Sequence, residues 1–199
     1  TKQISSANAS VAALWGAIYN TVYIANFILE RLPEVAGVPT TQRNQVMGTA
    51  YFLRGYAYFV ALYTFGGVPE VITTDIETNR NIPRATEAEI LGLIIDDYNE
   101  ALATLPEEPV NAGFAGEFAV RAAFARLYLY LGDWNKAVQF STEVIDSDQY
   151  ELEAEFSSLV IEDFTDEAIL EVGYTQADDP GSDGNFGLNN LFVGRREII

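Results

Sequence analysis

Positions 121–137 read RAAFARLYLYLGDWNKA, and this stretch decides the fold. Its small alanines allow a helix to approach a neighbouring helix closely. Gly132 follows the last apolar residue and suits a helix C-terminus, and Asp133 can cap a second helix by accepting a backbone hydrogen bond. Trp134 and Ala137 should then pack back on the first helix. The stretch predicts two antiparallel helices, 117–131 and from 134 onward, joined by a very short turn.

The same helical spacing, with apolar residues three and four positions apart, continues on the N-terminal side of this hairpin. It predicts helices over 11–32, ended by Pro33, over 41–65, and from the cap Thr86 to Leu105. Thr86 and Glu89 stand at capping-box spacing. In the hairpin the pattern predicts two buried stripes, namely Phe118, Ala122, Ala125 and Leu129, and then Trp134, Ala137, Ser141, Val144 and Ile145.

Three segments lack a helical period. Residues 68–85 contain two prolines and two asparagines and predict an extended excursion followed by a loop. Residues 168–174 are short, β-branched and aromatic, which predicts a strand, and 178–187 form a polar, glycine-rich loop. The predicted fold is mainly α, with antiparallel helix pairs and no strand–helix alternation that would build a parallel sheet. We expect one partial domain over 1–199, with a helical scaffold over about 8–150 and an irregular segment over about 151–199.

Composition excludes several classes of function. The 199 residues are 49% hydrophobic, which suffices for one sizeable core. The net charge of −18 comes from 29 acidic and 11 basic residues and repels phosphate backbones, so nucleic acid is not an expected partner. The continuous apolar runs are shorter than the roughly 20 residues of a spanning helix, so we expect no membrane crossing.

Catalytic chemistry is restricted because the sequence has no Cys and no His. Ser-His-Asp triads, Cys-His pairs and imidazole metal sites are therefore excluded. A carboxylate pair of the glycosidase type stays open as an alternative. The adjacent Asp96 and Asp97 point about 100° apart on a helix and cannot flank one bond. We therefore expect a protein that is not an enzyme.

No metal or other cofactor is expected. The loop 179–184 is similar to a calcium-binding loop, but it lacks an acidic residue at the third position and has Asn190 where the closing Glu belongs. The first residues lack a secretory-signal pattern, and the last five, RREII, end on apolar residues. These ends lead us to expect an excised fragment.

Two stretches carry a family resemblance. The hairpin at 121–137 resembles a tetratricopeptide unit. Positions 50–59, AYFLRGYAYF, and 65–69, FGGVP, resemble the helix and its exit in SusD/RagB proteins. Further matches follow in the family's order, at Trp15, Tyr19 and 24–26, then 83–86, Asp97 and Ala101, then 117–123, 132–134 and 166–169. The resemblance spans about Trp15 to Ile199.

The resemblance implies a lipoprotein on the outer face of the outer membrane of a Bacteroidetes-type bacterium. Such a lipoprotein takes part in polysaccharide utilisation. Such proteins cap a TonB-dependent, SusC-like transporter and pass oligosaccharide to it. Their helices serve as scaffold, and loops meet the glycan. This sequence lacks the lipidation Cys of the family, so membrane attachment through a lipid anchor is inferred. It also lacks the second half of a typical family member, so any site here is incomplete.

The main alternative is a tetratricopeptide-type protein-interaction module without glycan binding. Grooves of that type usually display several basic or Asn residues. This chain offers only Lys136 and scattered arginines near its repeat helices.

Sugar binding requires flat aromatic surface, with amide, carboxylate or guanidinium groups for the hydroxyls. The candidates near predicted loops or helix starts are Asn8, Trp15, Asn79, Arg80 and Phe114. Core packing is the competing interpretation for Trp15, and ordinary turn or surface roles compete for the other four. We expect Arg54 to pair with a carboxylate such as Asp97 or to stack on a ring, and the aromatics of 51–65 to form core.

Overall fold

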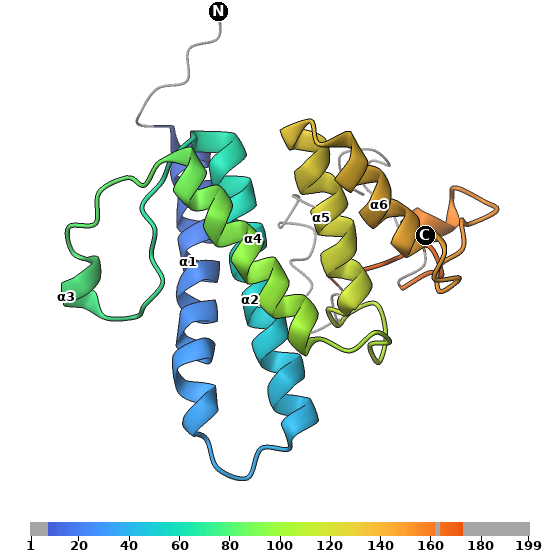
Figure 1. Cartoon of the computed structure of the whole chain (residues 1–199), viewed down its shortest axis with the longest axis horizontal. Helices are drawn as coiled ribbons and strands as arrows, with labels where there is room; N and C mark the ends of the chain where they lie inside the picture. Colours follow the sequence, from blue (N-terminus) through green and yellow to red (C-terminus); the bar gives the residue numbers. More distant parts are fainter. Residues whose placement is uncertain (1–7, 162–163, 173–199) are drawn as a thin grey trace, which may run out of the picture.

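The computed structural model describes residues 8–161 and 164–172, and the described part is built from helices (Figure 1). This confirms the prediction of a mainly α fold of antiparallel helix pairs. The five long helices are α1 (Ala9–Arg31), α2 (Thr40–Phe65), α4 (Glu87–Thr104), α5 (Glu117–Leu131) and α6 (Trp134–Ile145). Three short elements are the 3₁₀ turn Leu32–Glu34, α3 (Ile76–Asn79) and α7 (Ser158–Ile161).

Local sequence signals set most helix ends. Thr86 and Glu89 form a reciprocal capping box at the start of α4, and the Asp133 side chain accepts from the Lys136 N–H at the start of α6. Gly132 ends α5 in the left-handed conformation, with φ of 73°. These three predictions are confirmed. Pro33 lies inside the 3₁₀ turn, so α1 ends at Arg31.

The helices form two groups that meet at aromatic rings. The helix α2 packs against both α1 and α4, which crosses in front of it in Figure 1, and α5 pairs with α6. Gly55 on α2 permits the close approach of α4, since a Cβ there would lie 2.9 Å from the Tyr98 ring. Tyr98 on α4 in turn packs edge-to-face on Phe124 of α5, with centroids 5.1 Å apart. The core therefore runs continuously from α2 through α4 to α5.

The predicted buried stripes of the hairpin are wrong in part. Trp134 is 63% exposed, and Leu129 and Ile145 are also exposed. Trp134 lies at the turn itself, with its ring 3.9 Å from the position of a Cβ on Gly132, and does not reach the face of α5. The ring that packs on α5 is Phe140, which stacks on Phe124 at 4.7 Å.

The predicted strand over 168–174 is also wrong for its described part, 168–172, which has no strand. A single backbone hydrogen bond ties this segment to its neighbour, from the Glu171 N–H to the Ala112 carbonyl at 2.9 Å. The propensity for a strand is present, but among the described residues no second strand runs alongside to form a ladder. Positions 173–174 and the loop 178–187 lie outside the described residues.

One described helical stretch, Ala9–Glu34, is long and apolar enough by length and composition to cross a membrane. Short polar interruptions hide the stretch from a search for continuous apolar runs. Core helices pass the same test, and here Val22 and Asn26 are fully buried against the rest of the fold.

Candidate functional site

The chain between α2 and α4, residues 66–86, leaves the helices as a long excursion that we call the strap. Figure 1 shows the strap, with α3 at its tip, on the opposite side of the molecule from α5 and α6. The predicted extended excursion is confirmed, while the helical turn α3 at its tip was not expected. Asp75 caps α3 by accepting from the Thr78 N–H at 2.7 Å.

The two ends of the strap close on each other. The Ala85 N–H donates to the Val68 carbonyl at 2.9 Å, and Val68 is fully buried. The Arg84 guanidinium donates to the carbonyls of Phe65 and Gly67, at 3.1 and 2.6 Å. Gly67 is required at this closure, because a Cβ there would lie 2.2 Å from the Ala85 carbonyl oxygen.

Side chains from two helices hold the strap along its first half. From α1, the Tyr19 hydroxyl donates to the Pro69 carbonyl at 2.8 Å, and the Glu30 carboxylate accepts from the Thr74 N–H at 2.8 Å. From α2, the Tyr58 hydroxyl accepts from the Val71 N–H at 2.6 Å. The strap backbone is thus satisfied by helix side chains and fixed on the helices.

A buried polar network supports these contacts from beneath. Arg54 on α2 forms a bidentate pair with Asp97 on α4, at 2.9 Å from Nε and 2.6 Å from Nη2. Its Nη1 donates to the Asn26 side-chain oxygen at 2.7 Å, and the Asn26 amide donates to the Val71 carbonyl at 2.9 Å. The predicted Arg54–Asp97 pair is confirmed, and one chain of contacts joins α4, α2, α1 and the strap.

Burial sets the protonation of the two tyrosines that hold the strap. Burial raises the pKa of Tyr19 to about 12, against the opposing charge of Arg84. Burial likewise raises the pKa of Tyr58, although the hydrogen bond from Val71 acts in the other direction. Both hydroxyls therefore stay neutral at physiological pH and remain available as donors.

We expect stability to fall as the pH rises above about 10, the ordinary pKa of tyrosine. Above that pH the unfolded state loses tyrosine protons that the folded state keeps, so the unfolded state binds fewer protons and is favoured. Tyr58→Phe should lower the free energy of unfolding by about 1–2 kcal/mol at neutral pH, because the Val71 N–H loses its acceptor. The stability of this variant should then fall less steeply than that of the wild type above pH 10. Urea unfolding across this pH range measures both effects. An unchanged alkaline slope in the variant would contradict the assignment.

Two of the predicted binding residues, Asn79 and Arg80, lie at the tip of the strap. The Asn79 amide donates to the Thr73 carbonyl at 2.7 Å, and its side-chain oxygen is buried without a hydrogen-bond partner among the described residues. Arg80 is exposed and pairs with Glu77 at 2.9 Å. The strap tip therefore presents a guanidinium and a carboxylate close together, while the Asn79 amide is turned toward the strap's own backbone.

The other three candidates do not join this pair. Asn8 caps α1, with its side chain accepting from the N–H groups of Ser10 and Val11. Trp15 is half-buried against Tyr19 and Phe65, with ring centroids 4.9 and 5.1 Å away. Its ring therefore lies beside the root of the strap and not at the tip.

Phe114 lies on a different surface, at the edge of an apolar groove of about 390 Å³ between α1 and α2. The groove has an aliphatic lining that includes Ile24, Ile28 and Leu53. The structure thus brings together only Asn79 and Arg80, and separates Asn8, Trp15 and Phe114 from them.

Sequence reasoning missed the residues that hold the strap, Tyr19, Asn26, Glu30 and Tyr58. A signal existed for one of them, because Asn26 is a polar residue on the apolar stripe of a helix. Tyr58 offered no separate signal, since it lies within a run of aromatics of which many are core.

Comparisons with known proteins agree with this architecture. Residues 1–129 match the family model SusD-like 3, described as starch-binding and associating with the outer membrane. SusD-like protein P38 of Formosa agariphila is 30% identical over 140 residues, covering 69% of this chain and 27% of the relative.

Two solved structures show the same fold. A SusD superfamily protein from Parabacteroides distasonis is 27% identical, with a TM-score of 0.72, over 78% of this chain and 36% of that one. A laminarin-binding SusD-like protein is 24% identical, with a TM-score of 0.74, over 79% of this chain and 36% of that one.

The chain spans between 27% and 31% of the length of the curated relatives that it matches. The family model covers well over half of the chain, and it includes α1 to α4, most of α5 and the strap. The chain belongs to the SusD-like family.

Proposed function

We propose that this chain is part of a cell-surface protein that captures oligosaccharides and works with a TonB-dependent, SusC-like outer-membrane transporter. The observation that carries the proposal is the family match over residues 1–129, whose description names starch binding and outer-membrane association. A relative that binds laminarin supports a glycan as the ligand. The protein would sit on the outer face of the outer membrane, held by a lipid anchor.

The strap is the part of the described structure best suited to meet a glycan. Tyr19, Asn26 and Tyr58 fix its first part at Pro69 and Val71. Hydrogen bonds at Thr74, Thr78 and Asn79 order its tip, so little ordering entropy is lost when a ligand binds there. At that tip Arg80 offers donors and Glu77 offers acceptors for sugar hydroxyls. The half-buried Trp15 ring near the root adds apolar surface for a longer chain.

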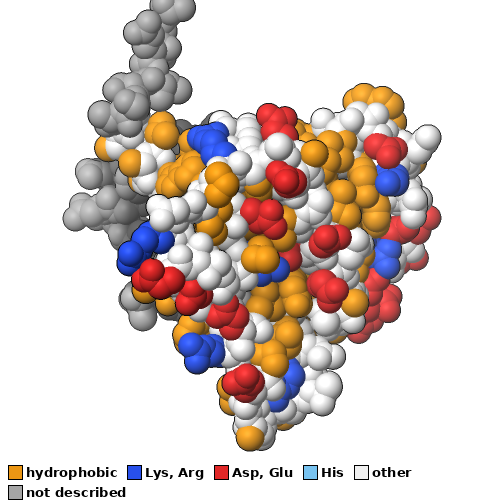
Figure 2. All heavy atoms as spheres, turned by 60° about the vertical axis from the view of Figure 1, so that its left-hand side comes forward, with side chains coloured by type: hydrophobic (Ala, Val, Ile, Leu, Met, Phe, Trp, Pro, Cys, Tyr) orange, Lys and Arg blue, Asp and Glu red, His pale blue; other side chains and the backbone are white. Residues whose placement is uncertain are grey.

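The charge distribution favours uncharged glycans. Figure 2 brings the strap side of Figure 1 forward and shows acidic side chains spread over this face, with hydrophobic side chains exposed between them. The net charge of −18 repels sulfated or carboxylated chains at long range. The protein would hold the glycan without cleaving it, in keeping with a family whose model is described by starch binding.

Titration calorimetry of the purified protein with a panel of neutral oligosaccharides tests the proposal. Arg80→Ala should weaken binding about tenfold, the effect of losing one or two hydrogen bonds to the ligand. Arg126→Ala is the matched control, because Arg126 is also an exposed arginine but lies on α5, away from the strap. It should leave the affinity unchanged.

Two results would overturn the assignment. If no glycan binds at millimolar concentration, nutrient capture is excluded and the protein-interaction module is favoured. A pull-down that recovers a soluble partner and no transporter would support that module. Release of reducing ends that disappears on substitution of acidic residues would identify a carboxylate-based glycosidase. Co-purification with an outer-membrane transporter tests the partner directly.

A further inference from the structure

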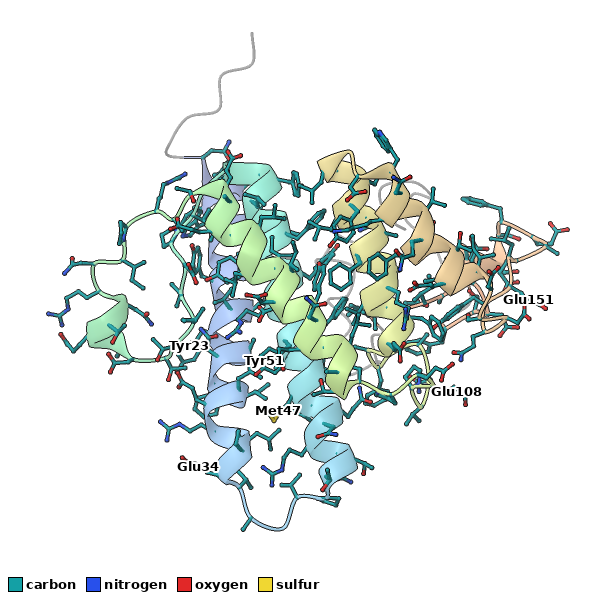
Figure 3. The ribbon with its side chains drawn as sticks, in the orientation of Figure 1. Tyr23, Glu34, Met47, Tyr51, Glu108 and Glu151 are labelled. Carbon is teal, nitrogen blue, oxygen red and sulfur yellow. The ribbon has the colours of Figure 1, made fainter. Side chains whose placement is uncertain are left out.

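A second cavity, of about 390 Å³, lies at the end of the molecule away from the strap. It is formed between the loop that follows α4 and the chain that follows α6. In Figure 3 the labelled Glu108 and Glu151 mark these two segments at the right-hand side. Its lining includes two rings, two amides and two carboxylates, from Tyr150 and Phe164, Asn111 and Gln149, and Glu108 and Asp166.

Specific contacts build the walls of this cavity. The Glu171 N–H donates to the Ala112 carbonyl at 2.9 Å, and the Glu151 N–H donates to the Asp166 carbonyl at 3.1 Å. These bonds join the loop after α4, the start of the chain after α6, and its later part. The cavity is open to solvent, but backbone from three stretches of sequence borders it, so it does not depend on long side chains alone.

Phe164 is held in an unusual conformation at this cavity. Its φ is 56°, in the left-handed region that residues with a β-carbon rarely adopt. The Phe164 N–H donates to a Glu171 carboxylate oxygen at 2.8 Å, and its ring lies 3.2 Å from the position of a Cβ on Gly113. Backbone strain of this kind costs about 1–3 kcal/mol, and such residues cluster at ligand sites. The strain here places an aromatic ring in the cavity wall.

The chemistry of the lining selects a class of ligand. The Phe164 and Tyr150 rings can pack against the apolar faces of a pyranose, and the amides and carboxylates can bind its hydroxyls. Burial raises the pKa of Tyr150, so its hydroxyl stays neutral. None of the described residues that line the cavity is basic, so an anionic sugar would find two carboxylates and no counter-charge.

We propose that this cavity binds a neutral saccharide unit at a site separate from the strap. The inference rests on the proposed function, since it takes a glycan to be the ligand, but it assigns a different place for it. The cavity volume falls within the roughly 300–1,000 Å³ of small-molecule sites. The groove beside Phe114 has a similar volume, but its mostly aliphatic lining offers few groups for hydroxyls.

Titration of the purified protein with maltohexaose, laminarihexaose and cellohexaose tests the site, with hexagalacturonic acid as the anionic probe. Phe164→Ala and Gln149→Ala should each weaken binding of the preferred neutral hexamer about tenfold, a typical effect of losing one stacking ring or one hydrogen-bonding side chain. The anionic hexamer should bind at least about tenfold more weakly than the neutral hexamers.

Matched controls separate the cavity from its surroundings. Phe156→Ala removes a ring that is 79% exposed in the same region and outside the lining, so it should leave the affinity unchanged. Glu108→Ala removes a carboxylate from the lining and should also weaken binding. Its control is Glu107→Ala, which should leave the affinity unchanged because Glu107 is exposed and outside the lining. Gln149→Ala keeps the test valid if Phe164→Ala disturbs the local fold.

The outcomes distinguish this inference from the proposed function. If a neutral hexamer binds and Arg80→Ala weakens it, while Gln149→Ala, Glu108→Ala and Phe164→Ala leave it unchanged, the cavity assignment is wrong and glycan capture stands. If the wild-type protein binds none of the hexamers, the proposed function fails and the cavity assignment fails with it. Weaker binding in the cavity variants alone supports the cavity as the main site.

Discussion

Arg54→Met is expected to lower the free energy of unfolding by about 3–5 kcal/mol. The substitution keeps most of the side-chain volume but leaves the buried Asp97 carboxylate without its bidentate partner. It also removes the donor to Asn26, whose amide holds the strap at Val71. Equilibrium urea unfolding, followed by helical circular dichroism, measures the loss.

The double variant Arg54→Met/Asp97→Leu is the control for this interpretation. It replaces both charges with apolar groups, so no uncompensated buried charge remains and most of the lost stability should return. The strap gives a second readout, because both variants leave Asn26 without its Arg54 contact and should expose residues 72–82 to limited proteolysis. Loss of less than about 1 kcal/mol in the single variant would show that the pair is not desolvated.

The sequence allowed the helices and their ends to be predicted because those signals are local. Thr86 with Glu89, Gly132 and Asp133 each act within one helical turn, and the structure shows each in its predicted role. The Arg54–Asp97 pair was predictable for another reason. A charge on a helix rich in aromatics must be buried, and a buried charge requires a partner.

The inward face of a helix was harder to predict than its length. In the hairpin, Leu129 and Trp134 fit a plausible stripe but are exposed, while Phe140 carries the contact with Phe124. Helices rich in apolar residues offer several overlapping stripes, and only the position of the neighbouring helix selects one. The strand predicted over 168–174 failed similarly in its described part, 168–172, since strand formation depends on a partner that local propensity does not reveal.

The candidate binding residues show the same limit. Asn79 and Arg80 were identified because polar residues cluster in a predicted loop, and they do lie together at the strap tip. The cavity at the other end draws on Asn111, Tyr150 and Phe164, which are up to 53 positions apart in sequence. No local pattern links them, so only the folded chain shows that a loop after α4 meets the chain after α6.

Phe124→Ala is expected to destabilise the protein by about 3–5 kcal/mol, the usual cost of removing a fully buried phenylalanine. Phe124 is 1% exposed and joins the two helix groups, since its ring contacts Tyr98 of α4 and Phe140 of α6, at 5.1 and 4.7 Å between centroids. The cavity left behind would lie between α4 and α5, and the contacts of Tyr130 on α5 with Phe59 and Tyr63 on α2 would remain between the groups. Thermal and urea unfolding should therefore show a lower midpoint and a broader transition.

The control for this variant is Phe156→Ala, which removes the same ring from an exposed position and should change stability by less than about 0.5 kcal/mol. Phe124→Leu gives an intermediate case, because it fills part of the cavity and should recover about half of the loss. The comparison tests whether α1, α2 and α4 unfold together with α5 and α6. If Phe124→Ala lowers stability without broadening the transition, the two groups unfold as one cooperative unit, and the contact between Phe124 and Tyr98 is not what couples them.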